Sequence, residues 1–313
     1  MTMSEQDVSG STQAADFENI TPSSVFLPRL AAGPDNDLHL PKLNDLGLDW
    51  IRIEAWEWQG LRQWADWWEM HAMHDASQER RWAELCWLFG STAEVVLLCL
   101  SASVEVELLR RAVETNKLPT IYGMSRRWFG EKTADSVISA GDKLANTVLR
   151  MLLLEDVTLA TAAFTGKAFI PFTDDKRNWI SIRDASKLSA ACGSSAAGFG
   201  TAAEVVLTLW QSDDWRRLTK LRDIDYHRGR RETAGVTGVA PDNTLWDRMK
   251  RDGQVGFGRE MLPTYTFADG YTDEVCDVAT KSLKALGAAM AEVRGVWDAS
   301  AGNVVRRPRR AGQ

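Results

Sequence analysis

Long apolar segments are few in this sequence, and we expect none of them to direct the chain into or across a membrane. Its first residues, Met1 to Asp7, contain neither the basic nor the apolar stretch of a secretory signal peptide. The longest apolar run covers about residues 93 to 104, whereas a membrane-spanning helix needs about 20 residues. We therefore expect a cytoplasmic protein that does not bind a membrane.

Cysteine is scarce, and no two cysteines are spaced as a metal-binding or redox pair. The chain has four, and none belongs to a Cys-x-x-Cys motif: Cys86, Cys99, Cys192 and Cys276. The first two lie in apolar stretches, which is typical of buried, reduced thiols. The sequence therefore predicts no disulfide framework.

Histidine is equally scarce, and only His71 and His74 suggest a metal site. They lie three residues apart in a predicted helix, so both can face one ion, with Glu69, Asp75 or Glu79 as further ligands. However, the zinc-protease spacing of His, Glu and a second His four residues on is absent. The surrounding tryptophans and methionines favour histidines that pack in a core, and we predict no metal site.

Catalytic motifs of fixed spacing are also missing. There is no Gly-x-Ser-x-Gly elbow, and Gly198-Phe-Gly200 lacks the strand, loop and Lys-Ser/Thr of a phosphate loop. Asp174 and Asp175 lack the third acid that an Asp-Asp-x-x-Asp motif requires, because Asn178 stands there. We expect no cofactor.

What the sequence does contain is enough apolar material for a sizeable core. The chain has 313 residues, of which 44% are hydrophobic and 26% charged. Its net charge of −6 argues against broad nucleic-acid affinity but leaves room for a local basic site. Seven of its 14 tryptophans fall between Trp56 and Trp87, which indicates dense packing in the first half.

Hydrophobic periodicity predicts an all-α fold in two parts. Residues 1–18 and 302–313 are expected as disordered tails, the second of them basic. Residues 19–120 form an N-terminal Trp-rich helical subdomain, with helices between about 54 and 114 and a break at Gly90 and Ser91. The only strand candidates are residues 49–53 and 168–172.

Residues 130–300 contain four predicted helices, which suggests a four-helix bundle. The first covers about residues 133–154, and the second begins near Ser194. The third begins at Ser212 or Asp213 and ends near His227, because Gly229 favours a helix C-terminus. A loop of about residues 229–270 precedes the fourth helix, which begins at Thr272 and ends near residue 298.

The end of the third helix carries the residues with the clearest chemical potential. Arg222 and Tyr226 are four residues apart and share a helix face, as do Asp223 and His227, so the carboxylate can orient the imidazole. A basic cluster follows at the helix C-terminus, formed by Arg228, Arg230 and Arg231. Arg222 and His227 lie about 140° apart around a straight helix. They converge only if the helix unwinds or if two copies meet at a two-fold interface.

This stretch resembles the signature of the HEPN superfamily of four-helix bundles, in which an Arg followed by a polar residue precedes a His by four to six residues. Here Asp223 follows Arg222, and four residues separate Arg222 from His227. The resemblance implies a homodimer that cleaves RNA without a metal, in defence, toxin–antitoxin or stress settings, where a protein partner or antitoxin is also expected.

The resemblance also assigns roles to individual residues. His227 would act as acid or base on the ribose 2′-OH or the leaving oxygen, and Arg222 would stabilise charge on the phosphate. Asp223 and Tyr226 would support them, and RNA would bind to Arg228, Arg230 and Arg231. In the alternative interpretation these side chains make surface ion pairs and a helix cap. The chain would then be a non-catalytic interaction module whose Trp-rich surface binds a protein partner.

Overall fold

The computed structural model describes residues 42–68, 76–115, 119–167, 169–172, 178–227 and 270–305. Within these ranges 85% of residues are helical and no strand is found, which confirms the all-α class. Both strand candidates were wrong where they are described. Residues 49–53 open a helix, and residues 169–172 form a turn in which Phe169 and Phe172 have positive φ angles of 46° and 56°.

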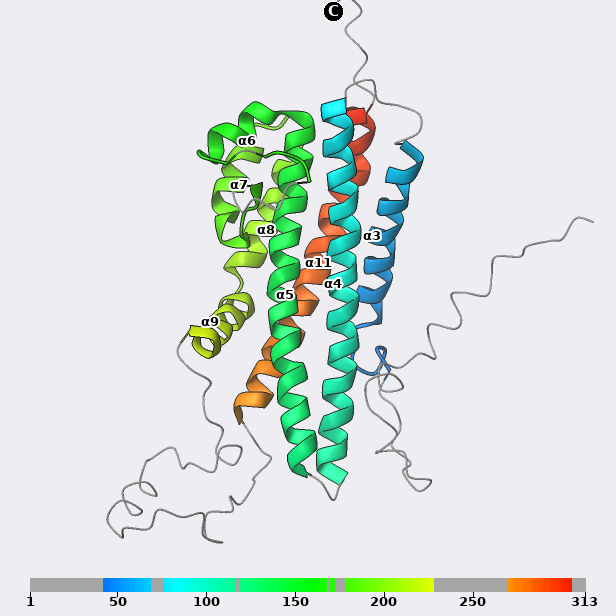
Figure 1. Ribbon diagram of the computed structural model, residues 1–313, viewed down its shortest axis with the longest axis vertical. Coiled ribbons are helices and arrows are strands. Elements are labelled where there is room, and N and C mark those ends of the chain that lie inside the picture. The colour runs from blue at the N-terminus through cyan, green and yellow to red at the C-terminus, as the bar shows by residue number, and fades with distance from the viewer. Residues whose placement is uncertain are drawn as a thin grey trace, which may run out of the picture.

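Two long antiparallel helices, α4 (Ala76–Thr115) and α5 (Pro119–Glu155), form the centre of the molecule (Figure 1). Pro119 is the first residue of α5, where its fixed φ angle suits a helix start and its missing N–H leaves no bond unmade. Val137, Leu144 and Val148 are fully buried and form an apolar face of α5.

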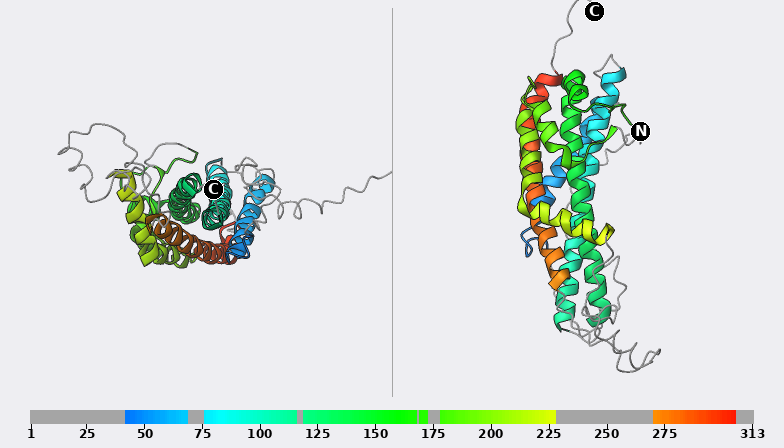
Figure 2. Two further views of the ribbon diagram at one scale, coloured as in Figure 1. Left: turned by 90° about the horizontal axis from the view of Figure 1, so that it is seen from below. Right: turned by 90° about the vertical axis from the view of Figure 1, so that its left-hand side faces the viewer.

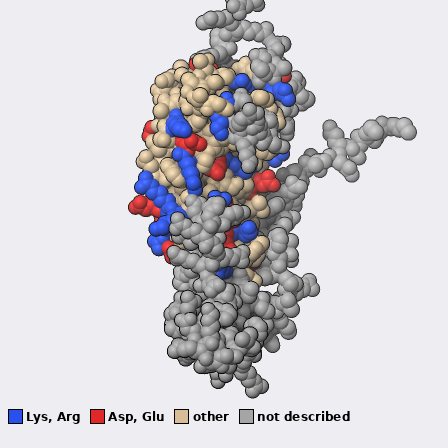
Figure 3. All heavy atoms as spheres, turned by 60° about the vertical axis from the view of Figure 1, so that its left-hand side comes forward, with Lys and Arg blue, Asp and Glu red and all other residues tan. Residues whose placement is uncertain are grey.

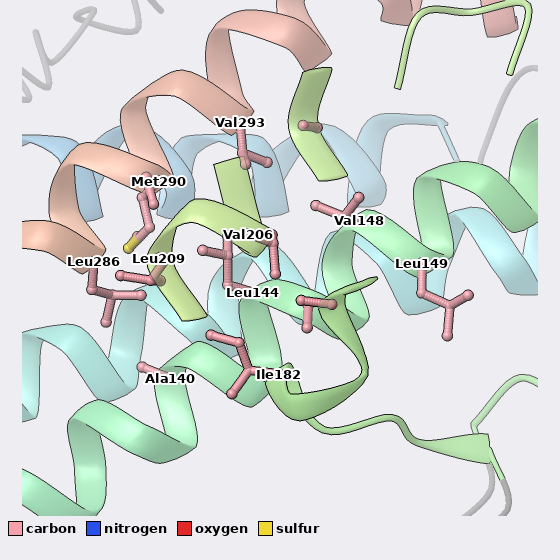
Figure 4. Close-up of a cluster of buried hydrophobic side chains, with 14 of the residues drawn as sticks. Ala140, Leu144, Val148, Leu149, Ile182, Val206, Leu209, Leu286, Met290 and Val293 are labelled. Atoms are coloured by element: carbon pink, nitrogen blue, oxygen red, sulfur yellow. The ribbon is translucent and has the colours of Figure 1, made fainter. Parts of the chain in front are cut away.

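A curved layer of helices covers one side of the α4–α5 pair (Figure 2). It contains α3 (Asp49–Trp68), α11 (Gly270–Val305), α7 (Ala185–Cys192), α8 (Gly200–Gln211) and α9 (Asp213–His227). The short helices α6 (Val157–Ala163) and η3 (Ile182–Asp184) connect α5 to this layer. The core lies between the layers (Figure 4), and the side chains labelled there come from α5, η3, α8 and α11: Ala140, Leu144, Val148, Leu149, Ile182, Val206, Leu209, Leu286, Met290 and Val293.

One hydrophobic cluster includes buried residues from both predicted parts, among them Trp58 and Leu85 from the first and Leu144 and Val293 from the second. The bounds of the two parts nevertheless stay a prediction. Residues 1–18 and 306–313 of the predicted tails lie outside the described residues, and α11 continues to Val305, beyond its predicted end.

Two predicted helix boundaries were wrong because glycine serves as a packing position. The break at Gly90 and Ser91 is absent, and α4 is continuous through both residues. A Cβ atom at Gly90 would lie 2.4 Å from Cδ of Arg62 on α3, so the glycine allows the two helices to approach. Likewise, α5 begins at Pro119 rather than near residue 133, and its Gly130 lies against Sγ of Cys276 on α11.

The sequence also missed the elements between α5 and α8. The second helix of this half was expected near Ser194, whereas α8 begins at Gly200 and is preceded by η3 and α7. The segment before η3 is attached to α5 by polar side chains. Asn146 donates to the carbonyl oxygen of Ile180 (2.7 Å) and accepts from its N–H (3.0 Å), and Asp142 accepts from the N–H of Ile182 (2.8 Å).

Helix α4 also contains a segment, Gln78–Arg111, that is long and apolar enough to cross a membrane, with a mean hydropathy of 1.8 in its most apolar window. It is the one such segment in the described residues, and 56% of that window is buried against the rest of the protein. A core helix passes the same test, so this segment is weak support for a membrane span. The cytoplasmic location stays a prediction.

A buried ion pair joins the two central helices. Nε and Nη2 of Arg150 on α5 donate to the Glu84 carboxylate on α4 at 2.9 and 3.1 Å, and the two side chains are 1% and 4% exposed. The Arg150 guanidinium also lies 5.1 Å from the centre of the Trp179 ring, and the N–H of Phe172 donates to Glu84 at 3.4 Å. One pair thus holds α4, α5 and the segment after α6 together.

Glu105, by contrast, is a buried acid without a cation. Its side chain on α4 is 1% exposed, and neither carboxylate oxygen has a hydrogen-bond partner among the described residues. Burial alone raises the pKa of Glu105 from 4.5 to about 7. The folded protein therefore keeps a proton that the unfolded chain releases between these values. This contribution to stability is complete below about pH 4.5 and is lost as the pH rises through about 7.

We expect Arg150→Met to lower the free energy of unfolding by about 3–5 kcal/mol, because it leaves the Glu84 carboxylate buried without its cation. The double variant Glu84→Leu/Arg150→Met should recover most of this loss, since no charge then remains buried. Urea unfolding followed by circular dichroism measures both. If the double variant is no more stable than Arg150→Met, the charge of Glu84 does not explain the loss.

We expect Glu105→Gln to unfold at a higher urea concentration than the wild type at pH 8 and at a similar concentration at pH 5, because it removes a carboxylate that burial disfavours. The gain at pH 8 should be about 1–3 kcal/mol. The matched control is Glu107→Gln in the same helix. Arg110 and Arg111 hold the pKa of Glu107 below its usual range, so that variant should lose stability at pH 8.

Candidate functional site

Helix α9 carries the predicted site residues, and its bounds confirm the predicted third helix. Asp213 and Asp214 occupy the first turn, where the helix dipole favours negative charge, and Oγ of Ser212 accepts from the N–H of Trp215 at 3.4 Å. Trp215 and Leu218 are fully buried and Leu221 is 6% exposed. This spacing of three residues places one apolar face of α9 against the core.

Two further contacts fix α9 relative to its neighbours. A Cβ atom at Gly141 of α5 would lie 2.3 Å from Cζ2 of Trp215, so only glycine leaves room for the indole ring. On the other flank, Nη2 of Arg217 lies 3.0 Å from Oε1 of Glu274 on α11. Helix α9 is therefore a well-fixed element, which suits a residue whose position matters for chemistry.

Arg222 lies at the junction of α9 and α5. Its Nε is 3.6 Å from Oδ1 of Asp135, and the two side chains are 36% and 33% exposed. The other carboxylate oxygen of Asp135, Oδ2, lies 3.8 Å from Nζ of Lys132. The Arg222 side chain is thus partly accessible to solvent while an acid of another helix contacts it. Nothing in the sequence around Arg222 could have identified Asp135 as this neighbour.

His227 is the last residue of α9, and the helix is unbroken from Arg222 to His227. Five steps of regular helix place the two Cα atoms about 140° apart around the axis. Arg222 and His227 could approach each other if the helix unwound or if two copies met at a two-fold axis. The helix does not unwind before His227, so the first possibility does not apply. Asp223 and Tyr226 belong to the same stretch of α9. The structure describes the backbone of residues 223–227 but not their side chains, and Arg228, Arg230 and Arg231 lie outside the described residues.

The face that carries α9 is richer in basic side chains than the predicted cluster suggested. Arg216, Arg217 and Lys220 are exposed on α9 itself, and Arg183 and Lys187 are exposed on η3 and α7. With this side of the molecule turned forward, Lys and Arg side chains gather on the described surface, with Asp and Glu side chains among them (Figure 3). The cations of residues 216–220 were not among the predicted site residues, although helical periodicity places them opposite Trp215 and Leu218.

The other residues singled out in the sequence are the cysteines and the possible metal ligands. The four cysteines are buried and free, as expected, and burial raises the pKa of Cys99 and of Cys192 to about 12, so neither thiol ionises near neutral pH. Over the described ranges no group of three His, Cys, Asp or Glu side chains is placed to hold a metal. His71, His74, Asp174 and Asp175 lie outside those ranges.

Asn178, which stands where an acidic motif would need its third acid, has a structural role. It is fully buried, and its Oδ1 accepts a hydrogen bond from the N–H of Ile170 at 3.0 Å. This bond ties the turn at residues 169–172 to the segment that precedes η3. The residue therefore explains the shape of a loop rather than a chemical function.

Comparisons with known proteins identify no relative of this chain. No family model matches the chain, and no curated protein or solved structure is significantly similar to it. The resemblance to HEPN domains therefore depends on the residues from Arg222 to His227, because α6, η3 and α7 add helices to the four that the sequence predicts in this half.

Proposed function

We propose that this protein is HEPN-like and cleaves RNA without a metal, as a homodimer. The observation that carries the proposal is the setting of Arg222, a partly exposed arginine five residues before a histidine, on a well-fixed helix that also exposes Arg216, Arg217 and Lys220. Planar guanidinium groups suit the charge and geometry of a phosphate. The resemblance to the HEPN signature adds a defence, toxin–antitoxin or stress setting with an antitoxin partner to the proposal.

Binding of RNA would begin on the cations of α9. Arg216 and Lys220 are exposed on α9, and Arg183 and Lys187 are exposed on η3 and α7. Contacts of this kind release counterions from the RNA and give an affinity that falls steeply with salt. The net charge of −6 would oppose binding elsewhere on the protein, so RNA would be directed to this face.

The chemistry then needs one proton acceptor and one cation. His227 would remove the proton of a ribose 2′-OH, and the 2′-oxygen would attack the adjacent phosphorus. The bond from phosphorus to the 5′-oxygen would break, the 5′-oxygen would take up a proton from the imidazolium formed in the first step, and a 2′,3′-cyclic phosphate would remain. Arg222 would stabilise the extra negative charge on the phosphate oxygens during the attack.

The proposal requires a dimer, and the geometry of α9 gives the reason. Because the helix is regular through His227, one chain does not place Arg222 and His227 on the same side. A two-fold axis near the end of α9 would bring Arg222 of one protomer toward His227 of its partner. Each dimer would then hold two such pairs.

We expect both Arg222→Ala and His227→Ala to lower the rate of RNA cleavage by about 10²–10⁴-fold, with EDTA having no effect. Cleavage of a fluorescent RNA by the purified variants measures this. Arg52→Ala is the matched control, because Arg52 also pairs with one aspartate, at 2.7 Å, and is 29% exposed. Arg222→Ala and Arg52→Ala should unfold within about 1 kcal/mol of the wild type, since exposed ion pairs contribute little. Full activity of Arg222→Ala or His227→Ala would contradict the assigned roles.

A second candidate function, a protein-interaction module, is favoured by the outer face of α3. Trp50, Ile53 and Trp56 are spaced three residues apart and are 42%, 51% and 43% exposed. Together they span about 120° of the helix surface over two turns. An exposed aliphatic side chain between two exposed tryptophans is typical of the centre of a protein interface.

For this second candidate we expect Ile53→Asp to weaken binding to a protein partner at least about tenfold, because a charge replaces the centre of the apolar face. The partner is cross-linked to the wild type in cells, purified, and titrated with each variant. Leu98→Asp is the control, since Leu98 is an equally apolar side chain, 61% exposed, on α4. Equal losses in both variants would exclude the α3 face as the specific contact.

A further inference from the structure

Asp135 of α5 is the acid that contacts the proposed phosphate-binding arginine. Its Oδ1 faces Nε of Arg222 at 3.6 Å, and its Oδ2 lies 3.8 Å from Nζ of Lys132. The carboxylate is 33% exposed, so it lies at the surface where RNA would approach. An acid at such a place weakens the attraction for a polyanion. The contact of Asp135 with Arg222 is the feature that could offset this unfavourable effect on RNA binding.

The two helices that present this pair are both fixed by buried neighbours. On α5, Ala134 and Val137 flank Asp135 and are 5% and 0% exposed. On α9, the Trp215 ring occupies the space beside Gly141, and Leu221 next to Arg222 is 6% exposed. The separation between the backbones of Asp135 and Arg222 is thus set by the core. The short aspartate side chain thus presents its charge 3.6 Å from Nε of the long arginine side chain, which has about 2 kcal/mol of rotamer entropy.

We infer that Asp135 is a positioning residue, which holds the Arg222 guanidinium at the α5–α9 junction so that it meets the RNA phosphate in one orientation. This inference rests on the proposed function and adds a residue to it. A positioned cation raises the rate of the chemical step, since small misplacements of a reacting group are costly. The negative charge of Asp135 at the same time weakens the binding of RNA.

These two effects have opposite signs in a kinetic experiment. In Asp135→Asn the repulsion is removed, so KM for RNA should fall by about two- to fivefold. The restraint on Arg222 is also weakened, so kcat should fall by about tenfold or more. Asp135→Glu keeps the charge and should retain more of kcat than the amide. A residue that only repels RNA would change KM alone, and a residue that only supports the fold would change stability.

The matched control is Asp277→Asn. Asp277 is 59% exposed on α11 and pairs with Lys281, whose pKa is raised first by Asp277 and to a lesser extent by Asp214 of α9. This acid therefore lies near α9 but has no contact with Arg222 among the described ion pairs. Its substitution should lower KM without lowering kcat. An equal loss of kcat in Asp277→Asn and Asp135→Asn would overturn the inference.

The experiment combines single-turnover cleavage of a short RNA with NMR of the arginine Nε–H groups in the wild type, Asp135→Asn and Asp277→Asn. We expect the Nε resonance of Arg222, assigned through Arg222→Ala, to shift only in Asp135→Asn, together with the loss of kcat. An unchanged resonance or an unchanged kcat overturns the role of Asp135, even if Arg222→Ala is inactive. A wild type that does not cleave RNA overturns the proposed function and this inference together, so the two failures are distinguishable.

Discussion

The packing of α4 against α5 is the constraint on which the rest of the molecule depends. Two polar contacts lie along the seam between these antiparallel helices and fix its register. Nζ of Lys143 donates a hydrogen bond to Oγ of Ser91, and Arg150 forms an ion pair with Glu84. Buried ion pairs are costly to desolvate, so this pair does not add much stability. Its effect is instead to favour one alignment of two otherwise similar apolar faces. Once the seam is aligned, the curved layer of helices has one surface on which to pack.

The position of α9 follows from that surface. Gly141 lies on the face of α5 that the seam turns toward the layer, and the Trp215 ring fills the space that its missing side chain leaves. Because α9 is anchored at this point, the next two turns bring Arg222 to Asp135 rather than to another part of α5. The candidate site is therefore a product of core packing, and its central contact forms between helices that are distant in the sequence.

Buried acids in this fold follow two different patterns. Glu54 and Glu84 each receive two hydrogen bonds from one arginine, Arg294 in the first case and Arg150 in the second. Each of these pairs connects two helices, α3 with α11 and α4 with α5. Glu105 has no such cation among the described residues, and burial raises its pKa to about 7. The fold thus uses paired acids to align helices, whereas the charge of Glu105 depends on pH near neutrality.

The sequence by itself determined the helical class and the bounds of α9, because an apolar repeat such as Trp215, Leu218 and Leu221 needs no information from elsewhere. It also placed Arg222 and His227 on one helix, where spacing alone sets the angle between them. Only the tertiary structure decided that α4 passes Gly90 without a break, since a glycine that breaks an isolated helix can instead admit a neighbouring side chain. Only the tertiary structure brought Asp135 to Arg222, because contacts between distant residues depend on how apolar faces pack, and periodicity shows each face but not its partner.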